Sequence, residues 1–132
     1  MPLDFRNVGK VVLAPMVNQS ELAFRMLCRK YDTNLCFTPM IHSRLFVEDA
    51  RYAKDVFSTV PEDRPLVIQI CGNDPHIMLK ASEKLQDHCD AIDINFGCPQ
   101  NIARRGNYGA FLLEDEEKVL HIVIAGRGIS WK

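Results

Sequence analysis

The sequence predicts an α/β fold built on a parallel sheet, and two observations carry this prediction. Short continuous runs of apolar residues recur along the chain, as in strands that are buried on both faces. Segments with the periodicity and capping residues of helices separate most of these runs, which is the order of a parallel sheet with helical crossovers. Such a sheet is either open or part of a (β/α)8 barrel, and 132 residues are enough for about half of such a barrel.

The first strand and helix are predicted near the N-terminus. The run VVLAPMV (11–17) predicts a buried strand, and Asn18 is expected to cap the next helix with Glu21 as its capping-box partner. Polar residues that recur every four positions should face solvent, and the apolar residues between them should face the core. The two sets are Glu21, Arg25 and Arg29, and Leu22, Ala23, Met26 and Leu27.

Three further strands are predicted, at residues 35–40, 65–72 and 91–95. Residues 41–64 show the least regular pattern, and we expect a short helix and a mobile loop there. Asp74 followed by Pro75 is a capping residue with a first-turn proline, which predicts a helix after the third strand. The last helix has an acidic start and a glycine stop, which are Glu114, Asp115, Glu116, Glu117 and Gly126.

Charge and cysteine content narrow the possible function classes. The formal net charge is −1, so no global basic field favours nucleic acid, and RNA contact would require a local patch. No apolar run is long enough to cross a bilayer, and the first residues lack the layout of a secretion signal. We therefore expect a cytoplasmic or nuclear protein without membrane association. The five cysteines contain no C-x-x-C pair, which argues against a disulfide framework or a metal site.

Polar or thiol groups follow several predicted strands at their carboxyl ends. They are Asn18 and Gln19 after the first strand, His42 after the second, and Asn95 and Cys98 after the fourth. Such a convergence fits the active site of a (β/α)8 barrel and equally the crevice of an open sheet. His42 could meet a ligand there, although a lone histidine is more often structural.

Cys98 is the main candidate for chemistry, because it lies between Gly97 and Pro99 on the loop after an apolar strand. A cysteine thiol in water has a pKa of about 8.5, so it is mostly protonated at neutral pH and can donate a proton. No histidine adjoins Cys98 in the sequence, which favours a general acid over a nucleophile. The alternative is a buried cysteine packed as a small hydrophobe, which we expect for the other four cysteines.

Two amides and two arginines are secondary candidates. Asn95 and Gln69 each offer a donor and an acceptor to a ligand. The alternatives are that Asn95 caps the following loop and that backbone groups satisfy Gln69. Arg104 and Arg105 lie in a stretch without acidic residues, in a loop that two glycines would keep adaptable. They would contact phosphates or form an ordinary solvated surface pair.

Four segments together resemble the tRNA-dihydrouridine synthase family. They are APMVNQSELAFRMLCRKY (14–31), LCFTPMIH (35–42), DRPLVIQICGNDP (63–75) and DAIDINFGCPQNIARRGNYGAFL (90–112). The last segment is the most specific, and the likeness extends from residue 11 to about residue 120. The chain most resembles the eukaryotic branch that modifies uridines 16 and 17 in the D-loop of tRNA.

The resemblance implies the N-terminal half of a flavin-dependent (β/α)8 TIM barrel. In the family, NADPH or NADH reduces FMN, the flavin passes hydride to C6 of a uracil, and a cysteine protonates C5, which gives 5,6-dihydrouridine. The target base must leave its stack to react. The family's proton donor falls on Cys98 and its active-site asparagine on Asn95. The FMN contacts fall on Pro15, Met16, Val17 and Gln69, and the basic RNA contacts fall on Arg104 and Arg105.

The resemblance stops before the fifth strand of the family's barrel. In the family, that strand carries a flavin-binding lysine. This chain ends in HIVIAGRGISWK, which does not match the strand, so we do not assign the role of that lysine to Lys132. We expect residues 1–132 to form one partial, truncated barrel domain that is weakly stable alone, self-associates through unpaired sheet edges and binds FMN poorly. We therefore expect these 132 residues alone to be inactive. Two alternatives stand beside the reductase: a non-catalytic product that binds RNA or protein, and another flavin-dependent pyrimidine oxidoreductase.

Overall fold

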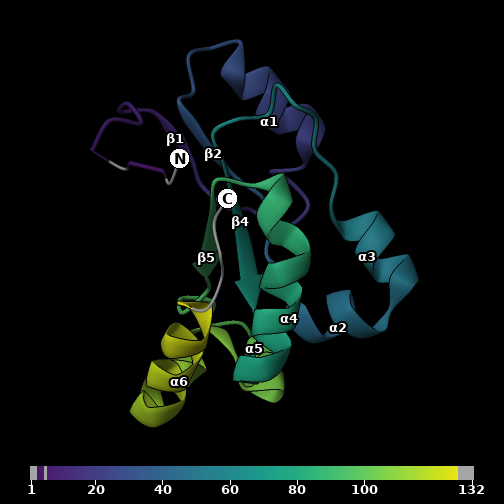
Figure 1. Cartoon of the computed structure of the whole chain (residues 1–132), viewed down its shortest axis with the longest axis vertical. Coiled ribbons are helices and arrows are strands. Elements are labelled where there is room, and N and C mark those ends of the chain that lie inside the picture. The colour runs from purple at the N-terminus through teal and green to yellow at the C-terminus, as the bar shows by residue number, and fades with distance from the viewer. Residues whose placement is uncertain (1–2, 5, 128–132) are drawn as a thin grey trace.

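A parallel sheet with helices packed against it forms the frame of the computed structural model, which describes residues 3, 4 and 6–127 (Figure 1). Its strands are β1 (Val12–Leu13), β2 (Leu35–Phe37), β3 (Ile41–His42), β4 (Leu66–Cys71) and β5 (Ala91–Ile94). Every pairing between them is parallel. The predicted α/β class with a parallel sheet is therefore confirmed.

Two of the short strands share one edge of β4. β2 pairs with the start of β4 and β3 with its end, while β5 runs along the other edge. The predicted strand 35–40 is thus interrupted, because Pro39 lacks the N–H that a continuous ladder needs. The Thr38 side chain fills the gap, since its Oγ1 accepts a hydrogen bond of 3.1 Å from the Gln69 N–H. The sheet therefore has four strand positions, as predicted.

The core lies between β4 and β5 and the two longest helices, α4 (Pro75–Leu85) and α6 (Glu116–Gly126). Figure 1 shows these two helices next to each other against the sheet, and they are in contact. Ile68 and Ile70 of β4 pack toward this core, and the alternate residue Gln69 therefore points to the opposite face of the sheet. Asp74 caps α4 by accepting from two backbone N–H groups, as predicted. The last helix also ends at Gly126, as predicted.

The first strand and the cap of the first helix differ from the prediction. The strand covers two residues only, because the chain after Pro15 enters a turn in which Ser20 bonds the backbone N–H and carbonyl of Met16. Asn18 lies in this turn with a φ of 58° and does not cap a helix. Helix α1 (Leu22–Arg29) begins later, with Glu21 at its N-cap position.

The predicted solvent face of α1 is also wrong. Arg25 is buried, whereas Leu27, which was predicted to face the core, is 48% exposed. Asp63 is the reason, because its fully buried carboxylate lies 2.8 Å from the Arg25 guanidinium and 3.0 Å from that of Arg29. A counter-charge 38 residues away thus turns the charged side of the helix inward.

Two segments predicted to contain loops are largely helical. Residues 41–64 hold α2 (Ser43–Glu48) and α3 (Ala50–Val56) rather than one helix. The segment after Cys98 forms α5 (Asn101–Gly106) and a 3-10 helix, η2 (Gly109–Glu114), and another 3-10 turn, η1 (Gln86–His88), precedes β5. No helix within the described residues is long and apolar enough to cross a membrane. Lys132 and its neighbours from 128 onward lie outside the described residues.

Candidate functional site

An open hollow of about 670 Å³ lies at the carboxyl ends of the strands, within the usual size of ligand pockets. In Figure 1 the arrow of β4 points to the end of the molecule where α2 and α5 lie. Each strand position contributes to the lining of the hollow. The lining residues that the sequence singled out are Pro15, Val17, Asn18, His42, Gln69, Asn95 and Cys98.

Gln19, which was expected to converge with the other polar groups, is exposed and does not line the hollow. Three of the residues to which the resemblance assigns a role do not line it either. One of them is Met16, which lies in the turn after β1 with its backbone N–H and carbonyl hydrogen-bonded to the Ser20 hydroxyl. Arg104 and Arg105 are the others, and both are exposed on the last turn of α5. They therefore lie on a helix rather than on the adaptable loop that was predicted. Asn107, with a φ of 49°, ends this helix.

Gln69, Asn95 and Cys98 belong to one chain of hydrogen bonds. The parallel register places Gln69 beside Asp93, and the Gln69 amide donates to the Asp93 carboxylate over 2.7 Å. The Asn95 amide donates to Gln69 Oε1 over 3.0 Å. Asn95 Oδ1 in turn accepts from the backbone N–H of Cys98 at 2.9 Å and of Gly97 at 3.1 Å. Each amide is thus oriented by its neighbour, and the chain ends at the backbone of the thiol residue.

This arrangement decides between the interpretations that the sequence left open. Asn95 does cap the loop after β5, and it also faces the hollow. The partners of Gln69 are two side chains rather than backbone groups, so that alternative is wrong.

Cys98 is partly exposed and lines the hollow, whereas Cys36, Cys71 and Cys89 are buried, as predicted, although Cys71 also lines the hollow. The prediction of a buried thiol is wrong for Cys28, which is partly exposed. Cys98 also packs against the edge of the apolar core, so its role as a proton donor stays a prediction.

Gly109 fixes the far side of the Cys98 loop. Its φ is +64°, and a Cβ added there would lie 2.6 Å from the Cys98 carbonyl oxygen and 3.0 Å from Cys98 Cβ. The next residue, Ala110, donates its N–H to the same carbonyl over 3.1 Å. Cys98 is thus held from both sides, by Asn95 through its N–H and by this turn through its carbonyl. Gly109, one of the two glycines that were predicted to keep this loop adaptable, therefore belongs to a fixed turn.

Three ring side chains also line the hollow, of which His42 was a candidate and Tyr52 and Tyr108 were not predicted. The backbone N–H of His42 donates to the Tyr52 hydroxyl over 3.0 Å, and the His42 ring packs edge-on against Tyr108 with centroids 5.3 Å apart. Burial, with the nearby Arg44 charge, lowers the pKa of His42 below 6.5. Burial raises the pKa of Tyr52 and of Tyr108 above 10. Burial thus favours the neutral form of all three ring side chains.

Comparisons with known proteins place the chain among relatives of one kind. The family model described as dihydrouridine synthase (Dus) matches residues 12–128. A tRNA-dihydrouridine(16/17) synthase of Schizosaccharomyces pombe, named with NAD(P)(+), is 54% identical over 125 residues, which cover 91% of this chain and 31% of that protein. The corresponding synthase of Saccharomyces cerevisiae is 46% identical over 124 residues, 90% of this chain and 29% of that protein.

More distant relatives bear related names. A human protein named as a tRNA-dihydrouridine(20a/20b) synthase-like protein is 40% identical over 124 residues, which cover 92% of this chain and 39% of that protein. The chain thus spans less than two fifths of the length of these relatives.

Proposed function

Because this chain belongs to the dihydrouridine synthase family, we propose that it takes part in the FMN-dependent reduction of uridine to 5,6-dihydrouridine in tRNA. NADPH or NADH would be the reductant, and uridines 16 and 17 in the D-loop of tRNA would be the target. The words NAD(P)(+) and 16/17 in the names of the two yeast relatives support the reductant and the two positions. The observation that carries the proposal is the hydrogen-bonded series from Gln69 through Asn95 to Cys98 along one side of the hollow.

The lining of the hollow suits a flavin ring. Pro15 and Val17 offer apolar surface from the end of the first strand, and Gln69 offers an amide edge whose orientation Asp93 and Asn95 fix. A flat ring with an apolar face and an amide-like edge is complementary to such a lining. Pro15, Val17 and Gln69 would therefore hold the ring, and Met16 would shape the turn through its bonds to Ser20. When bound, reduced FMN supplies the hydride for C6 of the uracil.

Cys98 supplies the proton in this proposal. Its thiol would release H⁺ to C5 of the uracil, so that the C5–C6 double bond gains one hydrogen at each carbon. The chain positions the thiol through the backbone, since Asn95 holds the Cys98 N–H and Ala110 holds its carbonyl. Asn95 therefore acts as the residue that orients the acid, and its amide borders the same hollow.

The RNA would approach across α5. Arg104 and Arg105 are exposed on this helix, which follows Cys98 directly, and their guanidinium groups are suited to phosphate contacts. The uridine must leave its stack to enter the hollow. Contacts of Arg104 and Arg105 with the phosphates on either side of the uridine would hold the RNA strand while the base is flipped out.

Product analysis tests this proposal. The protein carrying this sequence is incubated with FMN, NADPH and unmodified tRNA, and in parallel with free uridine, and nucleosides are analysed by mass spectrometry. We expect dihydrouridine from tRNA and none from free uridine. Reduction of free uridine alone would identify a different pyrimidine oxidoreductase, and tRNA binding without any product would identify a protein that only binds RNA.

A further inference from the structure

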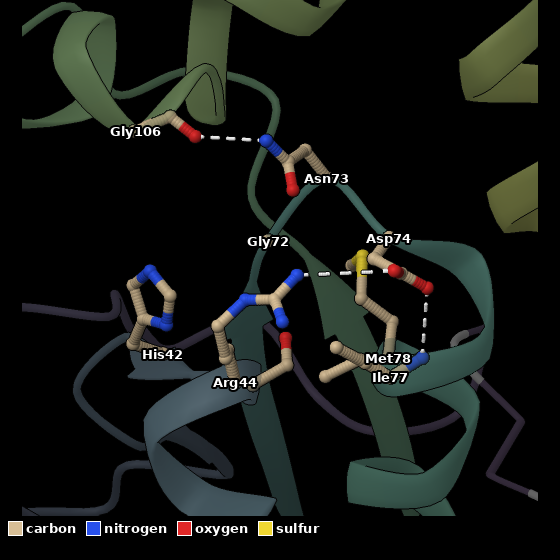
Figure 2. Close-up of a pocket in the computed structure, with 9 residues that line it drawn as sticks. His42, Arg44, Gly72, Asn73, Asp74, Ile77, Met78 and Gly106 are labelled. Atoms are coloured by element: carbon tan, nitrogen blue, oxygen red, sulfur yellow. Dashed lines mark hydrogen bonds and ion pairs between the residues drawn. The ribbon is translucent and has the colours of Figure 1, made fainter. Parts of the chain in front are cut away.

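A second, smaller pocket of about 260 Å³ adjoins the hollow, and His42 lines both (Figure 2). Its walls come from three segments of the chain: the start of α2, the turn between β4 and α4 with the beginning of α4, and the end of α5 at Gly106. The proposed chemistry uses the larger hollow and leaves this pocket without a role.

Arg44, whose ion pairs are weak, lies at the edge of this pocket. Figure 2 shows the Arg44 side chain directed across the pocket toward Asp74. The two charged groups lie 3.8 Å apart, with side chains 48% and 39% exposed, and a pair so long and so exposed is weak. Asp74 is engaged elsewhere, since its other carboxylate oxygen caps the start of α4. Arg44 also pairs with Glu48 on its own helix, at 3.3 Å and with the Glu48 side chain 57% exposed. Both pairs are exposed and therefore weak, so Arg44 is able to exchange either carboxylate for an anionic ligand.

The remaining walls are an amide and an apolar floor. Asn73 donates from its amide nitrogen to the Gly106 carbonyl over 2.9 Å, which holds the end of α5 against the β4–α4 turn. In Figure 2 the amide oxygen of Asn73 is turned away from this bond, toward the Gly72 side of the pocket. Ile77 and Met78 form the floor. A guanidinium, an amide acceptor and an apolar surface match the phosphate, the polar edge and the flat face of a nucleotide.

We propose that this pocket binds the nucleotide that neighbours the target uridine in the RNA strand. The inference rests on the proposed function. It is argued from the position of the two pockets, because a base in the larger hollow and its neighbour in this pocket would lie on either side of His42. Arg44 binds the phosphate, Ile77 and Met78 contact the base face, and Asn73 accepts from an amino or hydroxyl group. Arg104 and Arg105 end the same helix that closes the pocket at Gly106, which extends the basic surface along the strand.

A salt-dependent binding experiment with Arg44→Ala tests this assignment. The matched control is Arg51→Ala, because Arg51 is 92% exposed on α3, has a comparably long pair to Asp55 at 3.9 Å and does not line the pocket. Affinity for unmodified tRNA is measured at several salt concentrations. We expect Arg44→Ala to weaken binding about tenfold and to reduce the slope of log K against log salt by about one, with Arg51→Ala within about twofold of the unsubstituted protein.

The outcomes separate this inference from the proposed function. If the unsubstituted protein binds no tRNA, both fail. If it binds tRNA and the Arg44 and Arg51 variants bind equally well, the nucleotide pocket is refuted and the proposed function stands. A nicotinamide dinucleotide has similar chemistry, so the KM for NADPH is measured as well. A raised KM for NADPH with unchanged tRNA affinity would also overturn the assignment.

Discussion

Replacement of Asp63 should damage the fold strongly, because Asp63 is fully buried and neutralises two arginines at once. Arg25 and Arg29 lie on α1, with side chains 2% and 12% exposed. Asp63→Asn keeps the size of the side chain and removes its charge, which leaves the Arg25 guanidinium without a counter-charge. Breaking a buried ion pair in this way costs about 3–5 kcal/mol. This is a large part of the roughly 5–15 kcal/mol that stabilises an ordinary domain.

Urea unfolding followed by far-UV circular dichroism measures this loss. With a slope of about 1–3 kcal/mol per M, a loss of 3 kcal/mol lowers the midpoint by about 1–3 M. Arg51→Ala, which removes one member of an exposed pair, is the control and should change the free energy of unfolding by less than about 0.5 kcal/mol. The triple variant Arg25→Met, Arg29→Met and Asp63→Leu should recover much of the loss, since it removes all three members of the buried charge cluster. An Asp63→Asn midpoint equal to that of the control would refute the reasoning.

Three further predictions concern the site. Gly109→Ala should lower the rate of dihydrouridine formation about tenfold or more, because a Cβ there would meet the Cys98 carbonyl. The control is Gly97→Ala, which should change the rate little, because a Cβ at that position meets nothing within 4 Å. Equal rates for the two variants would contradict this prediction. The folded-state pKa of His42 lies below its unfolded value near 6.5, so the unfolded chain binds the proton more readily and stability should fall as pH falls from 7 through 6.5 toward the folded-state pKa. This part of the pH dependence should be absent from His42→Gln in urea titrations, and identical pH profiles would disprove it. Alkylation with iodoacetamide at pH 8 should label Cys98 well before Cys71 and Cys89, since burial raises the pKa of each of those two thiols to about 12; peptide mass spectrometry showing simultaneous labelling would argue against the described packing.

The parts of the fold that follow from local pattern could be predicted from the sequence. A buried parallel strand such as 66–71 needs apolar residues on both faces, and a capped helix start such as Asp74 with Pro75 depends on neighbouring residues alone. The face of α1 could not be predicted in this way, because Arg25 points inward to meet a carboxylate that is remote in sequence. Helical periodicity assigns charged residues to solvent unless the partner is known.

In the candidate site too, residues marked by a local sequence pattern could be predicted, and the others could not. Gln69, Asn95 and Cys98 were found because each follows or belongs to an apolar strand, and the register of β4 and β5 then brings them together. Tyr52 was missed, since it reaches the hollow from a helix in the segment with the least regular pattern. The α5 helix that carries Arg104 was taken for a loop because its six residues are too few to show a periodicity.

The proton-donor role of Cys98 is tested most directly by separating the two halves of the reaction in the protein carrying Cys98→Ala. NADPH oxidation without tRNA and tRNA affinity should match the unsubstituted protein, whereas dihydrouridine formation in a single turnover should slow about 100-fold or more. Cys28→Ala, which alters a partly exposed thiol on α1 that does not line the hollow, should leave all three quantities unchanged. Dihydrouridine formation at the unsubstituted rate by the Cys98→Ala protein would contradict the account.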